Sequence, residues 1–388
     1  MENLVSLDGL VLSPVIFLFF LIISLKIGTF FKVSYKLSLA LYLWHSLFTL
    51  IYIWFSLNFP ADSKRYFLLA TEHELGDFNF GTSFIVYVTY ILNKFFSFSY
   101  VDQFLVHNFM GYLGLIAFTA TIRQTILDKY KKIRIFGWIL VFLPSVSFWT
   151  SALGKDSISF MATGLVLWAA LDFKNRLGLF AFAVIAMLMV RPHIAAVMLA
   201  AYALSFIFDK RSSLVQRFII GTLALVGSAL VIPLAMQYAG LGDAQNAADI
   251  QDYIDQRQDS NLDGGSSLDI SSMSLPMQLF TYLFRPLPFE AKSIFAFISS
   301  IDNLILLALV ILGSIAILKK SQPSIESNRI FLWIYVGLTW LIFASTTANL
   351  GIATRQKWMF APMLIFLLLS VIGTRKVNNE KVTNEIVK

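Results

Sequence analysis

Long apolar segments alternate with short polar ones along almost the whole chain. A bilayer core is about 30 Å thick and is crossed by about 20 apolar helical residues, so each long segment is a candidate span. The pattern predicts an all-α protein, a polytopic membrane helix bundle of about 11 spans. The expected spans are 11–31, 37–57, 104–121, 135–149, 156–172, 177–190, 193–208, 218–238, 294–317, 330–347 and 357–373.

Basic residues collect in alternate connections between these segments. One set of connections, taken with Lys26 and the carboxyl-terminal tail, carries 20 basic and 6 acidic residues. Of the chain's 30 basic and 23 acidic residues, this leaves 10 and 17 for the other side. Because cytoplasmic loops are enriched in Lys and Arg, the first side is expected to be cytoplasmic. We therefore predict a single integral membrane domain over 1–388, with its amino terminus outside and its carboxyl terminus in the cytoplasm.

Two connections on the predicted outer side are long. The first, 58–102, contains the aromatic stretch 81–99, and a span there would move the basic cluster of 129–134 to the outer side. We therefore expect 81–99 to be an amphipathic helix that lies on the outer face or dips into it. In the second loop, 239–292, residues 239–276 hold seven Asp and one Arg. Low hydrophobicity and high charge predict a partly mobile acidic flap there.

The composition agrees with a membrane protein and excludes several kinds of site. The chain is 57% hydrophobic and 14% charged, with a mean hydropathy of +0.73. Because it has no cysteine, it has no disulfide, thiolate metal ligand or thiol nucleophile. The basic residues set topology in short loops, so nucleic acid is not an expected partner. We find neither a metal-ligand spacing nor a Gly-rich phosphate loop, and expect no metal and no cofactor.

Five polar clusters interrupt the apolar pattern at the predicted outer surface. Ionisable groups at a membrane edge are costly, which favours a functional interpretation. Asp62 precedes Lys64 and Arg65 in the first cluster, and Lys155 precedes Asp156 in the second. A carboxylate in such a place can serve as general base toward a sugar hydroxyl, and a lysine can hold a phosphate. The alternative for each aspartate is helix N-capping.

The third cluster lies where Pro192 separates two short apolar runs. Pro breaks a helix, and broken backbone at membrane depth must line protein or water. Arg191 suits bidentate phosphate recognition there. His193 is either a proton carrier or a hydrogen-bonded structural residue. We expect the isolated His45 and His107 to be packing residues.

The last two clusters precede apolar segments near the carboxyl-terminal end. Arg285 is a candidate ligand for an anionic headgroup, with Glu290 expected to pair with Lys292. Its alternative role is an interfacial anchor that reaches toward lipid phosphates. Arg355 and Lys357 end another short outer loop, beside a tryptophan typical of the interfacial aromatic belt.

Several of these features together resemble the multispan GT-C type glycosyltransferases and the bacterial O-antigen and exopolysaccharide polymerases. They are the aspartate in the first outer loop with an amphipathic helix after it, the GlyLysAspSer turn, and an arginine before the final span. The stretch PheArgProLeuProPheGlu is similar to a segment of bacterial envelope-polysaccharide membrane proteins. The resemblance covers most of the chain in layout, through short motifs.

The resemblance implies transfer of a sugar or oligosaccharide from a polyprenyl phosphate or diphosphate at the outer face of the bacterial inner membrane. It implies that Asp62 is the catalytic base or a metal-associated residue, and that Arg191, Arg285 and Arg355 hold the lipid-linked phosphates. Two departures from the family favour a polymerase: no second carboxylate closely follows Asp62, and an extra span precedes the loop.

We therefore expect an enzyme of surface-polysaccharide synthesis, a glycosyltransferase or polymerase. Catalytic roles are assigned to Asp62, Lys155 and Asp156, and substrate binding to Arg191, His193, Arg285, Arg355 and Lys357. Expected partners are the polyprenyl-linked glycan, membrane lipids and other polysaccharide-assembly proteins. The alternatives are a flippase for a lipid-linked glycan, which favours charges deep in helices and repeat symmetry, and a membrane acyltransferase, which favours an intramembrane histidine such as His45.

Overall fold

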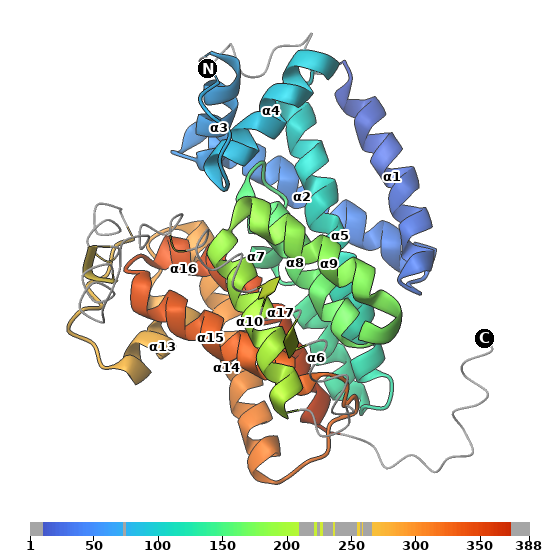
Figure 1. Ribbon diagram of the computed structural model, residues 1–388, viewed down its shortest axis with the longest axis vertical. Coiled ribbons are helices and arrows are strands. Elements are labelled where there is room, and N and C mark those ends of the chain that lie inside the picture. The colour runs from blue at the N-terminus through green and yellow to red at the C-terminus, as the bar shows by residue number, and fades with distance from the viewer. Residues whose placement is uncertain are drawn as a thin grey trace.

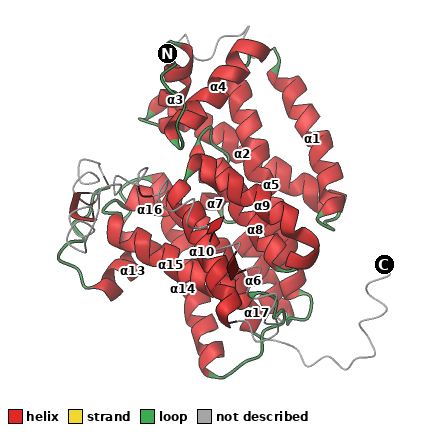
Figure 2. Ribbon diagram, viewed as in Figure 1, coloured by secondary structure: helices red, strands yellow, loops and turns green. Residues whose placement is uncertain are grey.

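The computed structural model describes residues 11–72, 75–208 and 266–373, with isolated positions between 221 and 258. Every named element in these residues is a helix, and the helices pack into one bundle (Figures 1 and 2). The predicted span 218–238 and most of the predicted flap 239–276 lie outside the described residues, apart from the few isolated positions.

The amino-terminal part of the chain, coloured from blue to green in Figure 1, forms the first group of helices. They are α1 (Ser13–Phe30), α2 (Tyr35–Asn58), α3 (Asp62–Thr71), α4 (Thr82–Phe96), α5 (Tyr100–Ile126), α6 (Lys131–Val141), α7 (Pro144–Thr150), α8 (Lys155–Ala170), α9 (Phe173–Val190) and α10 (Pro192–Phe208). The carboxyl-terminal helices are α13 (Leu275–Phe284), α14 (Ile294–Leu318), α15 (Arg329–Thr346), α16 (Leu350–Gln356) and α17 (Ala361–Val371), with single 3₁₀ turns at Pro288–Glu290 and Lys357–Met359.

Seven helices in the described part of the chain are long and apolar enough to cross a membrane. They are α1, α2, α5, α9, α14, α15, and α6 with α7 over Lys131–Thr150. The number rises to eight if Leu350–Met359 and Ala361–Val371, which meet at a bend of 64°, form one broken span. The all-helical class predicted from the sequence is thus confirmed, with seven or eight candidate membrane spans, whereas 11 spans are not.

Three further predicted segments form helices of 15 to 17 residues, α4, α8 and α10, which are shorter than the roughly 20 residues that cross a bilayer. The segment 156–172 corresponds to α8, which has 16 residues and is buried almost throughout. The apolar part of the segment 193–208 covers Pro192–Ser205. The stretch 81–99 contains α4, whose 15 residues fall short of the roughly 20 that cross a bilayer.

The centre of the bundle is built around glycines that allow α5 and α8 to touch through their backbones. A Cβ atom added to Gly164 would lie 2.3 Å from the carbonyl oxygen of Gly114, and one added to Gly114 would lie 2.5 Å from that of Phe160. Small residues at such positions allow close helix packing in membranes. Because α8 is fixed against α5 in this way, its amino-terminal end, Lys155 and Asp156, is held at a defined place in the bundle.

Candidate functional site

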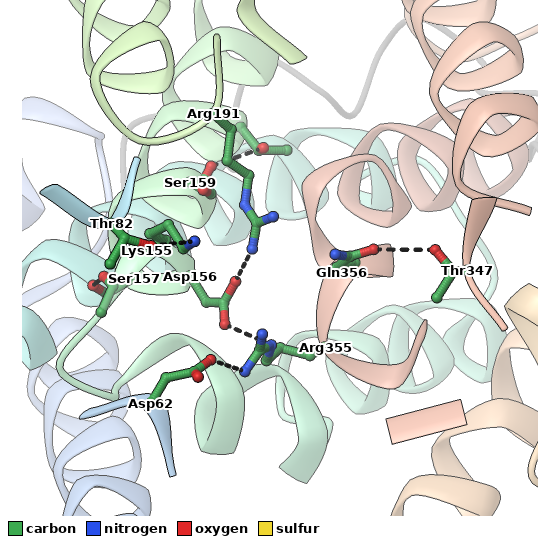
Figure 3. Close-up of polar contacts among 12 residues, drawn as sticks. Asp62, Thr82, Lys155, Asp156, Ser157, Ser159, Arg191, Thr347, Arg355 and Gln356 are labelled. Carbon is green, nitrogen blue, oxygen red and sulfur yellow. Dashed lines mark hydrogen bonds and ion pairs between the residues drawn. The ribbon is translucent and has the colours of Figure 1, made fainter. Parts of the chain in front are cut away.

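Four charged side chains from four separate parts of the chain form a line of alternating charge, which we call the charge ladder (Figure 3). Arg355 Nη1 donates a hydrogen bond to Asp62 Oδ2 at 2.8 Å, and its Nε forms an ion pair with Asp156 Oδ2 at 3.0 Å. Arg191 Nη2 donates to the other oxygen, Asp156 Oδ1, at 2.7 Å. The order along the ladder is therefore Asp62, Arg355, Asp156 and Arg191.

The two aspartates of the ladder do not cap their helices. Ala61 is the N-cap of α3 and Gly154 that of α8, and neither helix has a side-chain cap hydrogen bond. Asp62 and Asp156 lie within the first turns, where the helix dipole favours a negative charge. Their side chains are directed to arginines of distant elements, so the capping alternative is wrong for both.

The two arginines of the ladder come from places where the helices end. Arg191 follows the last residue of α9, and Pro192 directly after it starts α10, as the helix break in the sequence predicted. Arg355 lies in the last turn of α16, where a positive charge interacts well with the helix dipole. The helix ends at which these arginines lie therefore also bring them to the aspartates of α3 and α8.

The turn before α8 depends on a glycine. Gly154 has a φ of +151°, which side-chain-bearing residues rarely adopt, and a Cβ atom there would lie 3.3 Å from the ring of Tyr66. Burial raises the pKa of this tyrosine well above its usual value. Lys155, the first residue of α8, donates to Thr82 Oγ1 at 3.2 Å (Figure 3) and lines a small pocket together with Asp62, Asp156 and Arg355 of the ladder. The turn thus places Asp156 within the ladder and Lys155 beside it, bound to α4.

A first cavity of about 680 Å³ opens at the Asp62 end of the ladder. It carries Asp62, Lys64, Arg65 and Arg355, so positive groups outnumber negative ones. The remaining lining residues are Tyr52, Phe55, Pro60, Ala61, Leu68, Leu69, Trp149, Asn349, Gly351 and Ile352. Such a site combines cationic groups for an anionic ligand with aromatic faces that can pack against a sugar ring.

A second cavity of about 660 Å³ adjoins the first, because Phe55, Trp149 and Gly351 line both. Its walls are largely apolar and come from α2, α7, α14 and α16; they include Phe48, Ile51, Phe59, Phe148, Phe295, Ile298 and Leu350. Arg285, Glu290 and Lys292 provide its charged groups. An apolar cavity with a few basic groups suits a ligand that has both a hydrocarbon part and an anionic part.

The described end of the second predicted outer loop reaches this cavity. Leu268 donates through its backbone to the carbonyl of Ala348 at 2.9 Å, and Leu350 to that of Ser266 at 3.0 Å. Ser266 and Leu268 also line the second cavity. The loop is therefore attached to the site near its middle, at Ser266 and Leu268.

Arg285 is held by a carboxylate of its own turn. Its Nε donates to Glu290 Oε1 at 2.8 Å, and the backbone N–H of Leu287 donates to Glu290 Oε2 at 2.7 Å. Partial burial works to raise the pKa of Glu290, but these hydrogen bonds outweigh it and lower that pKa below its usual range. Glu290 thus pairs with Arg285, and the expected pairing with Lys292 was wrong.

Lys357 is one of the predicted site residues that line neither cavity. Its side chain is 0% exposed, and its Nζ donates to Asn303 Oδ1. Asn303 Nδ2 in turn donates to the carbonyl oxygen of Pro286 at 3.0 Å. Lys357 thus ties its own turn to α14, and Asn303 links α14 to the turn that carries Arg285. The assignment of Lys357 to substrate binding stays a prediction.

The histidines also lie away from the two cavities. His193 is half-buried in the first turn of α10 and lines neither of them. His45 and His107 are fully buried, as expected for packing residues, and His107 Nδ1 lies 2.8 Å from Ser157 Oγ. Among the residues that the structure describes, no three His, Asp or Glu side chains are grouped closely enough to hold a metal ion.

The aromatic lining of the site was missed by sequence reasoning. Tyr52 and Phe55 on α2 and Trp149 on α7 lie in apolar segments, where aromatic residues are ordinarily part of the core. A helical projection of α2 would place Tyr52 and Phe55 near one face, but nothing in the sequence marks that face as a cavity wall. Lys64 and Arg65 were recognised as members of a polar cluster without being assigned to the site.

No protein-family model, curated protein or solved structure matches this chain. The resemblance to glycosyltransferases and polymerases therefore has no support from these comparisons. Function has to be inferred from the charge ladder and the two adjoining cavities.

Proposed function

We propose that this protein transfers or polymerises sugars carried on a polyprenyl phosphate or diphosphate, at the outer face of a bacterial inner membrane, for surface-polysaccharide synthesis. The observation that carries the proposal is the contact between two cavities of different character. One is polar and cationic and includes an exposed carboxylate, Asp62; the other is largely apolar and includes Arg285 and Lys292. A lipid-linked sugar needs both environments, one beside the other.

In the proposed reaction, a hydroxyl oxygen of the acceptor sugar attacks the anomeric carbon of the donor. The bond from that carbon to the phosphate oxygen breaks, and the polyprenyl phosphate or diphosphate leaves with the bonding electrons. Asp62 accepts the hydroxyl proton as general base. Arg355, Lys64 and Arg65 neutralise the charge that develops on the leaving group, a contribution that is often the largest single one in catalysis.

The second cavity would hold the isoprenoid chain near the head group. Its phenylalanine-rich wall supplies apolar contact, and Arg285 and Lys292 lie where they can reach a phosphate. The acidic flap predicted at 239–276 would cover the glycan, since Ser266 and Leu268 within it are attached beside this cavity. This arrangement requires the topology predicted from the charge distribution, with about 11 spans, the amino terminus outside and the carboxyl terminus in the cytoplasm.

The direct test is turnover of a labelled polyprenyl-diphosphate-linked oligosaccharide by the purified protein in detergent. A transferase or polymerase converts the donor to a longer product without any membrane partition, whereas a flippase leaves it chemically unchanged. We expect the wild-type protein to consume the donor. An unchanged donor, together with lipid movement in reconstituted vesicles, would establish the transporter instead.

The same assay tests the role of Arg355. We expect Arg355→Ala to lower turnover by about 10²- to 10³-fold, because it removes a donor that neutralises the leaving group. The matched control is Arg134→Ala, which should retain full turnover. It removes an exposed arginine of α6 that is distant in sequence from the site residues. Normal product from Arg355→Ala would contradict the proposed function.

A further inference from the structure

We infer that Asp62 occupies the place of a ligand anion on Arg355: a phosphate or diphosphate entering the first cavity takes over its contact with Arg355 and releases the carboxylate. This deepens the proposed function, and rests on it for the identity of the molecule that carries the phosphate. It assigns to the ladder one exchangeable contact and two permanent ones.

The exposure of the side chains shows which contact is exchangeable. The Asp62 side chain is 46% exposed, whereas those of Asp156 and Arg191 are 16% and 7% exposed. An exposed ion pair contributes little to stability because water screens it, whereas breaking a buried pair leaves a charge without a partner. An incoming anion therefore replaces Asp62 far more easily than it replaces Asp156.

The guanidinium geometry allows this exchange without disturbing the rest of the ladder. Arg355 uses Nη1 for Asp62 and Nε for Asp156, so two different nitrogens hold the two carboxylates. Asp156 in turn gives Oδ2 to Arg355 and Oδ1 to Arg191. When Asp62 leaves, Asp156 still holds Arg355 in position, and the vacated Nη1 remains directed toward the cavity.

The first cavity also supplies the attraction that an anion needs. Lys64 and Arg65 follow Asp62 on the first turn of α3 and line the same cavity as Arg355. Arginine and lysine donors bind phosphate through charge-assisted hydrogen bonds. Three cationic groups then face the anion, while the released Asp62 stays on the rim of the cavity, free to accept a hydroxyl proton. Binding of the anion and availability of the base are thus coupled.

The inference predicts that neutralising Asp62 strengthens anion binding, although Asp62 lines the site. Binding of inorganic pyrophosphate and of a short-chain prenyl diphosphate is measured by isothermal titration calorimetry on the purified full-length protein in detergent. We expect Asp62→Asn to bind both about two- to fivefold more tightly, since its competition with the ligand for Arg355 is removed. Asp77→Asn, an exposed aspartate of the same loop, is the charge-matched control and should bind as the wild type does.

A double-mutant cycle with Arg355→Lys separates displacement from a general effect of charge. If the anion takes the place of Asp62 on Arg355, the gain from Asp62→Asn disappears in the Arg355→Lys background, or binding there is lost altogether. Unchanged or weaker binding in Asp62→Asn overturns the inference, and so does an equal gain in both backgrounds. A retained melting temperature shows that each variant is folded.

These measurements can fail independently of the proposed function. They use anion binding without turnover, so the exchange on Arg355 can be disproved while the protein still extends a lipid-linked glycan. Conversely, Asp62→Asn could show the expected gain in anion binding while the wild-type protein shows no turnover. The protein would then bind phosphate without being a transferase. Asp62→Asn should also lose turnover, and this second readout separates a base from a mere competitor.

Discussion

Arg355 and Arg285 both bind a carboxylate beside a cavity, but the two pairs connect the molecule differently. Arg355 binds Asp62, 293 residues away in the sequence, and also Asp156 on α8. Arg285 binds Glu290, five residues further along the same turn. The first pair forms only when α3, α8 and α16 have packed, whereas the second needs no other helix. Breaking the ladder should therefore disturb the whole bundle, and breaking the Arg285 pair only a turn.

The largest effect is expected from Asp156→Ala. This change leaves Arg191 and Arg355 facing each other without their shared partner, and breaking a buried pair costs about 3–5 kcal/mol. The free energy of unfolding in detergent should fall accordingly. Asp62→Ala, which removes the exposed end of the ladder, should cost no more than about 1 kcal/mol. Equal losses in the two variants would mean that the buried and the exposed ion pairs of the ladder stabilise the protein equally, which would contradict this prediction.

A smaller effect on stability is expected from Gly154→Ala. The positive φ and the nearby ring of Tyr66 make this residue strained for any side chain, at a cost of about 1–3 kcal/mol. Because Asp156 would be displaced with the start of α8, turnover of the lipid-linked glycan should fall as well. Gly178→Ala, where a Cβ atom meets open space, is the matched control. If the two variants have the same melting temperature, the turn does not depend on its glycine.

The smallest effect is expected from Glu290→Gln, which removes a charge from the local pair. The pKa of Glu290 is lowered in the folded protein from its usual 4.5, so its contribution is present above that pH and is lost as the pH falls through the folded value. Wild type and variant should differ slightly in melting temperature at pH 7 and converge in acid. A difference that persists well below pH 4.5 would contradict this origin.

The residues around Arg355 show how far sequence reasoning reached. Arg355 and Lys357 are two residues apart in one polar cluster, and both were predicted to bind substrate. The structure places Arg355 at the cavity and encloses Lys357 beside Asn303. Two residues span about half a helical turn, so these side chains point in different directions. Which direction faces a cavity depends on α14 and α2, which are distant in sequence. The aromatic wall of Tyr52, Phe55 and Trp149 was missed for the same reason.

The class of this protein was determined by its sequence alone, since apolar segments of span length specify helices whatever their neighbours are. The sequence also indicated which charged residues are exceptional, because a charge at the end of an apolar segment is costly. Only the tertiary structure decided that Asp62, Asp156, Arg191 and Arg355 form one ladder, with Lys155 beside it and Lys357 enclosed elsewhere. The physical reason is that pairing between distant charges depends on how helices pack, and local sequence does not encode that packing.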